Sequence, residues 1–149
     1  MKKISYIKDL QKWKEAFNFF TRIKVRFSET DMFGHMNNVS AFIYFEQARI
    51  EYLQYIGFSL DENGDQGIPL VADLQCDFHK QVFFNEEIRL YVKANHVGTS
   101  SIDIHYMGLN EKEDICITGR GALVYVDKTQ YKPIKIPQHM VNKLIKGQK

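Results

Sequence analysis

Residues 39–56 limit what this chain can fold into more than any other stretch, because they read as one long helix with hardly any polar face. Its charged and amide side chains are Glu46, Gln47, Arg49, Glu51 and Gln54. A helix that is apolar nearly all round is buried on several sides, and this one, about 27 Å long, is able to cross a wide sheet. Asn37 or Asn38 suits the N-cap, and Gly57 suits the C-terminal stop. The fold must therefore enclose this helix.

The remaining sequence predicts mainly strands. Residues 6–20 repeat apolar side chains at three- and four-residue steps, which predicts a helix packed on the protein body or, as an alternative, lying on a membrane surface. Alternation predicts a strand at 21–28, and turn residues predict a loop at 59–68. Short breaks that suit antiparallel hairpins separate four longer strands. These strands are expected at 70–82, 87–96, 100–109 and 115–127, and a short helix is expected at 138–146.

The element order predicts an α+β fold in which a curved antiparallel sheet of about five strands wraps around the central helix. The 149 residues suit one domain over residues 1–149. Within it we expect an N-terminal helical extension at 1–20, a core at 21–137 and a C-terminal tail at 138–149. A single sheet leaves part of the helix uncovered and keeps exposed edges, so a dimer is expected. Gly119 and Gly121 interrupt the last strand, where a bulge or a close backbone approach is expected.

Composition argues against several classes of function. The net charge is +2 and the basic residues are dispersed, which argues against a nucleic-acid interface. There is no apolar run long enough for a membrane span, and the N-terminus lacks the apolar core of a signal peptide, so a cytoplasmic protein is expected. The five histidines show no zinc-type spacing with Cys76 and Cys116, so no metal site is expected. The two cysteines are expected to be buried free thiols.

Asp31 lies on a polar turn a few residues before the start of the central helix. Helix N-termini carry unpaired backbone N–H groups and a partial positive charge, which together can hold an oxygen bearing negative charge. A carboxylate beside such donors can attack an activated acyl group directly or activate a water molecule that does so. The alternative is that Asp31 only caps its turn, as aspartates often do.

Three polar residues near Asp31 are further candidates. His35 carries an imidazole, which can act as an acid or base, support a neighbour by a hydrogen bond, or be structural. Asn37 and Asn38 are caps first, although either side chain can orient a water molecule or the substrate carbonyl. The sequence leaves these roles open.

Three more residues of this turn are expected beside the site. Thr30 either supports the Asp31 carboxylate through a hydrogen bond or is a plain turn residue. Gly34 permits a positive φ or a close approach of substrate. Phe33, with aromatic residues of the helix, suggests an apolar substrate pocket, although aromatic side chains also serve core packing.

A resemblance to a known family follows from these motifs. Residues 25–38 read Val-Arg-Phe-Ser-Glu-Thr-Asp-Met-Phe-Gly-His-Met-Asn-Asn, and residues 44–49 read Tyr-Phe-Glu-Gln-Ala-Arg. Together they resemble the hotdog-fold acyl-CoA thioesterases of the 4-hydroxybenzoyl-CoA thioesterase family. Supporting similarity lies at 97–101, 122–127 and 132–137, so the resemblance covers about residues 21–137. One departure is that the family's Tyr-x-Arg-Pro-type segment reads Phe-His-Lys-Gln at 78–81.

The resemblance implies a hotdog fold and hydrolysis of an acyl-CoA thioester to free acid and coenzyme A. It places the catalytic carboxylate at Asp31 and the oxyanion-binding backbone amide at Asn38. It implies no cofactor, since coenzyme A is part of the substrate. Family members are homodimers or dimers of dimers with active sites at the subunit interface, so a homodimer or homotetramer is expected.

Other substrate-binding residues follow from the same resemblance. Glu46 is expected to be buried and paired with Arg49, or to be a second active-site carboxylate, because some hotdog thioesterases place a glutamate on this helix. Coenzyme A needs cations or donors for its phosphates, and Lys80 and Ser100 are candidates.

Two other functions remain as alternatives. Hotdog enoyl-thioester hydratases carry an Asp-x-Asn-Pro-x-His run, but here His35 follows Asp31 by one residue too few and the Asn-Pro pair is absent. A non-catalytic acyl-thioester sensor or binding module usually has an appended DNA-binding domain, for which this chain has no room.

Overall fold

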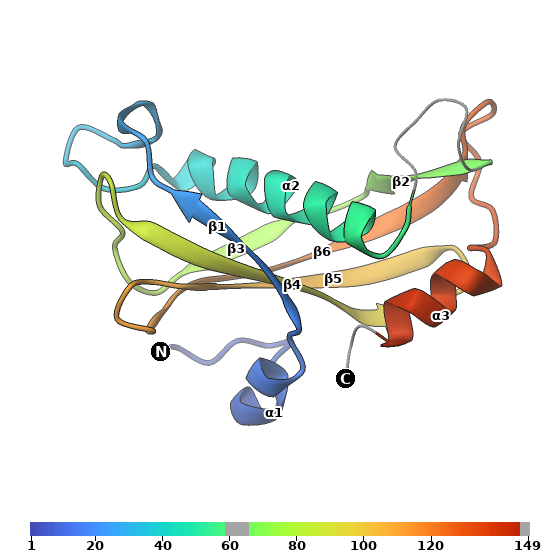
Figure 1. Ribbon diagram of the computed structural model, residues 1–149, viewed down its shortest axis with the longest axis horizontal. Helices are drawn as coiled ribbons and strands as arrows, with labels where there is room; N and C mark the ends of the chain where they lie inside the picture. Colours follow the sequence, from blue (N-terminus) through green and yellow to red (C-terminus); the bar gives the residue numbers. More distant parts are fainter. Residues whose placement is uncertain (59–65, 147–149) are drawn as a thin grey trace.

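The structure is a computed structural model that describes residues 1–58 and 66–146. A curved antiparallel sheet carries α2 against one face and α1 on the opposite side (Figure 1). The elements are α1 (Leu10–Glu15), β1 (Phe19–Lys24), the 3-10 turn η1 (Phe27–Glu29), α2 (Asn38–Tyr55), β2 (Gly67–Val71), β3 (Gln75–Phe78), β4 (Glu87–Val97), β5 (Ser101–Leu109), β6 (Ile115–Asp127) and α3 (Gln138–Lys146). The predicted α+β hotdog architecture is confirmed.

Six strands make up the sheet within the described residues, in the order β1-β4-β5-β6-β2, and β3 also pairs with β6. The single strand predicted at 70–82 is therefore wrong in its extent: it is divided into β2 and β3, whose pairings with β6 differ in register by one residue, and residues 79–82 belong to no strand. The two backbones approach closely at this division, where a side chain at Gly121 would meet the Asp73 carbonyl oxygen at 2.5 Å. Asp73 also accepts a hydrogen bond from Ala122 N–H at 2.7 Å. The expected close backbone approach at Gly121 is confirmed.

The N-terminal helix is shorter than predicted, and the strand that follows it begins and ends earlier. The helix expected at 6–20 is limited to α1, which Asp9 caps by accepting from Lys12 N–H. Phe19 and Phe20 instead begin β1, where they pair with β4. The strand expected at 21–28 ends at Lys24, because the chain then turns into η1. Tertiary pairing thus overrides a helical apolar pattern in this segment.

The central helix begins within one residue of its predicted start. Asn37 is the N-cap, and its side chain accepts a hydrogen bond from Val39 N–H. At the other end Gly57 has a φ of +97°, the left-handed conformation of a glycine that follows a helix. The expected loop at 59–68 mostly lies outside the described residues, and Gly67 and Ile68 already belong to β2.

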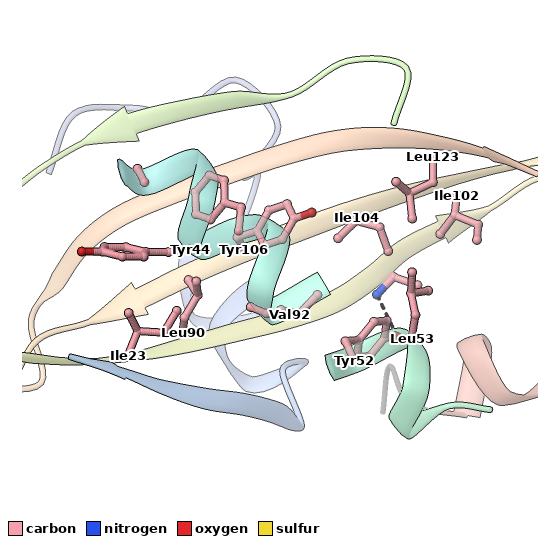
Figure 2. Packing of buried hydrophobic residues seen from close by; sticks show 14 of the residues in the cluster. Ile23, Tyr44, Tyr52, Leu53, Leu90, Val92, Ile102, Ile104, Tyr106 and Leu123 are labelled. Atoms are coloured by element: carbon pink, nitrogen blue, oxygen red, sulfur yellow. Dashed lines mark hydrogen bonds between the residues drawn. The ribbon is translucent and has the colours of Figure 1, made fainter. Parts of the chain in front are cut away.

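One face of α2 packs on the concave face of the sheet (Figure 2). Tyr44, Tyr52 and Leu53 are buried there against strand residues, and Phe45 stacks on Tyr106 with ring centroids 4.3 Å apart. The opposite face is open and carries both apolar and polar side chains: Ile43 is 51% exposed, and Glu46 is exposed on the same side. The expectation that the helix is buried on several sides is wrong for a single chain, since the sheet covers only one side.

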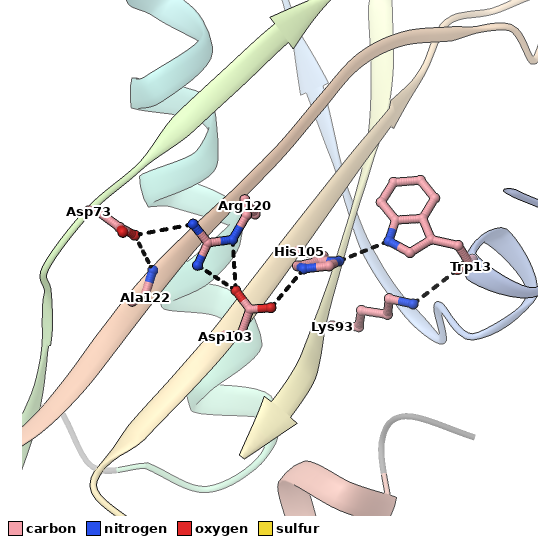
Figure 3. Close-up of polar contacts among 7 residues, drawn as sticks. All are labelled: Trp13, Asp73, Lys93, Asp103, His105, Arg120 and Ala122. Carbon is pink, nitrogen blue, oxygen red and sulfur yellow. Dashed lines mark hydrogen bonds and ion pairs between the residues drawn. The ribbon is translucent and has the colours of Figure 1, made fainter. Parts of the chain in front are cut away.

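The N-terminal segment covers the other face of the sheet. Trp13 and Phe17 pack with Met107 and Leu109. Beneath them lies a row of polar contacts, drawn in Figure 3. Trp13 Nε1–H donates to His105 Nδ1 at 2.9 Å.

This row continues across three strands (Figure 3). Nε2 of His105 lies 2.9 Å from Asp103 Oδ2. Asp103 in turn pairs with Arg120 at 2.7 Å, and Lys93 Nζ donates to the Trp13 carbonyl oxygen at 3.1 Å. These contacts fix the N-terminal segment to the sheet.

Three smaller expectations can be compared with the structure. Cys76 and Cys116 are free thiols, as predicted, although Cys76 is only partly buried. The closing helix α3 has the predicted bounds and buries Met140 and Leu144. Within the described residues, the helices are all too short or too polar to cross a bilayer.

Candidate active site

A pocket of about 290 Å³ opens beside the start of α2. It is lined by the turn before the helix, by the first residue of the helix and by the segment that follows β3. The lining residues are Asp31, His35, Met36, Asn38, Phe78, His79, Lys80, Gln81 and Val82. Four of the predicted site residues, Asp31, His35, Asn38 and Lys80, therefore meet at one pocket.

Asp31 is held by the turn that it closes. Its Oδ1 accepts hydrogen bonds from Phe33 N–H at 2.8 Å and from His35 N–H at 3.2 Å. Its own N–H donates to the His35 carbonyl oxygen at 2.8 Å. The turn-capping interpretation is thus correct for Oδ1. Because both bonds go to that oxygen, Oδ2 is the one suited to meet a substrate or a water molecule.

Gly34 gives this turn its shape. It has a φ of +81°, so the expected positive φ is confirmed. A side chain added there would have nothing within 4 Å. Backbone conformation, and not crowding, therefore requires glycine at this position.

One backbone N–H at the start of α2 is left to bind a ligand. The Asn37 side chain accepts from Val39 N–H at 3.1 Å, and the Asn37 carbonyl oxygen accepts from Ser40 N–H at 2.9 Å. Asn37 N–H itself donates to the Glu29 carbonyl oxygen at 2.7 Å. These bonds leave the Asn38 N–H as the first-turn donor for a ligand, and Asn38 lines the pocket. Asn37 is a cap, as expected, and its side chain is committed to that role.

Two histidines line the pocket with different surroundings. The His35 ring packs edge-on against Phe83, with centroids 4.9 Å apart. Nε2 of His79 lies 2.8 Å from the hydroxyl of Thr118, a fully buried side chain. Burial lowers the pKa of His79, so its ring is neutral at pH 7.

Three predicted residues have other surroundings than expected. The Thr30 hydroxyl donates to the Phe27 carbonyl oxygen at 2.7 Å, which agrees with the turn-residue alternative and not with a hydrogen bond to Asp31. Phe33 is 73% exposed and is not among the pocket residues. Ser100 lies just before β5, whose first residue pairs with Val124 in the second half of β6. The pocket instead adjoins β3, which pairs with the first half of β6.

The expected burial of Glu46 is wrong. Glu46 is exposed on the outer side of α2, whereas Arg49 is buried and donates to the Tyr106 hydroxyl at 3.1 Å. The two side chains lie on different faces because the inner face of the helix includes position 49 but not position 46. Lys80 lines the pocket, yet its Nζ pairs with Asp114 at 3.0 Å.

The sequence did not reveal that residues 78–82 form the second wall of the pocket. Met36 N–H donates to the Val82 carbonyl oxygen at 2.6 Å, which pins this segment to the turn before α2. The bridge between His35 and Phe83 joins the same two segments, which are far apart in the sequence. The sequence had offered one residue of this wall, Lys80, as a candidate for phosphate binding. Within the described residues there is no cluster of three or more histidine, cysteine or acidic residues suited to a metal.

Comparison with known proteins gives consistent matches. The family model described as Thioesterase-like superfamily matches residues 25–144. A Bacillus subtilis (strain 168) relative, the uncharacterized protein YsmA, is 48% identical over 124 residues, which cover 83% of each chain. The crystal structure of the PA5185 protein from Pseudomonas aeruginosa is 30% identical with a TM-score of 0.81, over 90% of this chain and 94% of that one. A Thermus thermophilus thioesterase crystallised with coenzyme A and Zn is 26% identical with a TM-score of 0.77, over 90% and 96% of the chains.

Proposed function

Because this chain belongs to the Thioesterase-like superfamily and is a thioester hydrolase, we propose that its substrate is an acyl-CoA, cleaved to the free acid and coenzyme A. The observation that supports this most is that Asp31 and Asn38 line one pocket at the tip of α2. A thioesterase that resembles this chain along most of its length binds coenzyme A.

In the proposed reaction the thioester carbonyl oxygen accepts a hydrogen bond from Asn38 N–H. In one route Asp31 removes a proton from water while the water oxygen adds to the carbonyl carbon. In the other route Asp31 Oδ2 adds directly, and water later hydrolyses the resulting anhydride. In both routes the negative charge on the carbonyl oxygen is held by the amide, and its collapse expels the coenzyme A thiolate, which then takes up a proton. One well-placed oxyanion donor contributes roughly 10²–10³ in rate.

Coenzyme A carries phosphates, and Lys80 is the cation that lines this pocket. Its Asp114 partner and Lys80 itself are both more than one third exposed. An exposed ion pair of this kind is weak, roughly 0–1 kcal/mol, so a phosphate can replace Asp114 at little cost. His35 and Gly34 shape the turn that presents Asp31, and Ser100 and Glu46 of the same chain have no contact with this pocket.

We also propose a homodimer, alone or paired into a tetramer, in the cytoplasm. Val39, Ile43 and Ile50 share the outer face of α2 and are 60%, 51% and 37% exposed. Leu70 and Phe78, on the neighbouring edge strands β2 and β3, are 41% and 46% exposed. Exposed apolar side chains on the helix, together with a free sheet edge, favour covering by a second copy.

A panel of acyl-CoA thioesters with short, long and aromatic acyl groups tests the proposed substrate. A thiol-reactive dye should report release of free thiol from at least one of them. Hydration of crotonyl-CoA without thiol release would indicate an enoyl-thioester hydratase. Binding of acyl-CoA without any turnover would indicate a sensor.

A further inference from the structure

Glu29 is a buried carboxylate that the proposed reaction does not use directly. It is 7% exposed although it lies in the short turn η1. Burial raises its pKa, but hydrogen bonds from Arg26 and Tyr44 outweigh this, and the net pKa lies below its usual value. Glu29 is therefore charged at neutral pH, and a buried charge is retained only where several partners hold it.

The side chain of Glu29 joins η1 to the second turn of α2. Oε1 accepts from the Tyr44 hydroxyl at 3.0 Å and from Arg26 N–H at 3.0 Å. Oε2 accepts from the Arg26 guanidinium at 2.9 Å. Tyr44 is 3% exposed and belongs to the core of the protein (Figure 2). The carboxylate thus ties a surface turn to a rigid, buried anchor.

The backbone of Glu29 is bonded to the first turn of the same helix. Its carbonyl oxygen accepts from Asn37 N–H at 2.7 Å and from the Ser40 hydroxyl at 3.1 Å. Positions 37, 40 and 44 recur at three- and four-residue steps, so they lie on one face of α2. One residue therefore contacts the helix at three successive points.

Asp31 follows Glu29 by two residues, and Asn38 follows the bonded Asn37 directly. We propose that Glu29 is a positioning residue, which fixes the distance between the Asp31 carboxylate and the Asn38 amide. This proposal rests on thioester hydrolysis at this pocket. The reaction needs the Asn38 amide at the carbonyl oxygen and the Asp31 carboxylate, or its water molecule, at the carbonyl carbon, and a displacement of about 1 Å can cost on the order of 100-fold in rate.

Substitutions at both ends of the side-chain contact test this role. Glu29→Gln keeps the shape but removes the charge, and Tyr44→Phe removes only the hydroxyl. Each should lower kcat about tenfold or more while KM changes much less, because reacting groups and not binding groups are displaced. The double variant should lose little more than the worse single variant, because Glu29→Gln removes the charge that strengthens the bond from Tyr44 and Tyr44→Phe removes that same bond.

Tyr52→Phe is the matched control. It removes a buried hydroxyl from the same helix, where Tyr52 accepts a hydrogen bond from Ala94 N–H, without a contact to η1. It should keep kcat within about twofold, although it lowers the melting temperature about as much as Tyr44→Phe does, because each removes one buried hydrogen bond. Equal losses of kcat in Tyr44→Phe and Tyr52→Phe would show a general loss of folding and overturn the proposal.

Backbone amide NMR separates this proposal from the proposed function. The amide signals of Phe33, His35 and Asn38 should shift in Glu29→Gln and stay in place in the control. Wild-type protein without turnover on the acyl-CoA panel would overturn the proposed function, and with it any catalytic consequence of the Glu29 contacts. Full activity of Glu29→Gln, in a wild type that is active, would overturn the Glu29 proposal alone.

Discussion

Among single residues, Asp31 has both a structural and a proposed chemical role. Its Oδ1 closes the turn by accepting hydrogen bonds from two backbone N–H groups, and its Oδ2 is left for the proposed reaction. The sequence predicted that Asp31 lies on a turn beside the start of α2, because a turn and a helix start are local features. It could not predict Glu29, because the Tyr44 hydroxyl that holds its carboxylate lies fifteen residues away.

Gly34 gives a prediction at this scale. Gly34→Ala should lower the free energy of unfolding by roughly 1–2 kcal/mol, because an L-residue is strained at a φ of +81°. Urea unfolding followed by circular dichroism measures this. Gly34→Asn should lose less, since asparagine tolerates the left-handed region better than alanine. Equal stability of the alanine variant and wild type would show that the turn does not need this conformation.

At the scale of elements, the sequence predicted helix bounds that depend on local periodicity, and it missed strand bounds that depend on pairing with distant strands. The bounds of α2 and α3 follow from local spacing and caps, so they were predicted to within one residue. The segment from 6 to 28 was harder, since Phe19 and Phe20 fit a helical pattern but pair with β4. The split between β2 and β3 accompanies a one-residue difference in their register with β6, which no local pattern encodes.

The contact between Trp13 of α1 and His105 of the sheet predicts how the stability of the fold depends on pH. Burial lowers the pKa of His105 despite the nearby Asp103, so the unfolded state binds this proton first. The His105 contribution to stability is therefore complete above about pH 6.5 and declines as the pH falls below it. Lys93 and Arg120 nearby also disfavour the protonated ring.

Trp13 reports this change because it is the only tryptophan of the chain. Its indole N–H donates to His105, so protonation of the ring removes the acceptor. Trp13 emission should shift to longer wavelength as the pH falls from 7 towards the acid unfolding transition, and His105→Gln should weaken that dependence. An emission maximum that is unchanged over this range would contradict the prediction.

At the scale of the whole molecule, the sheet covers one side of α2 and leaves the other side open. The sequence predicted the layers correctly, because a long apolar helix followed by alternating strands has few other arrangements. It also predicted that one sheet cannot enclose such a helix. The outer face of α2, which includes Val39, Ile43 and Ile50, is the physical basis of the proposed homodimer.

Ile43→Glu should therefore weaken self-association. A charge on the outer face of α2 would have to be buried without a partner if a second copy covers it. Sedimentation velocity over a concentration series should show a shift from dimer towards monomer. Ile145→Glu, at a 54% exposed position on α3, is the control and should keep the wild-type distribution. A wild-type protein that is monomeric at all concentrations would exclude the homodimer.

The proposed reaction depends on the Asp31 carboxylate beside the Asn38 amide, and Asp31→Asn removes that carboxylate alone. Asparagine keeps an oxygen that can accept from Phe33 and His35 N–H, so the turn should persist and melting temperature should change little. The steady-state kcat on the best acyl-CoA of the panel should fall about 10²-fold or more, since neither direct attack nor proton removal is then possible. A folded Asp31→Asn protein that retains wild-type kcat would contradict the account.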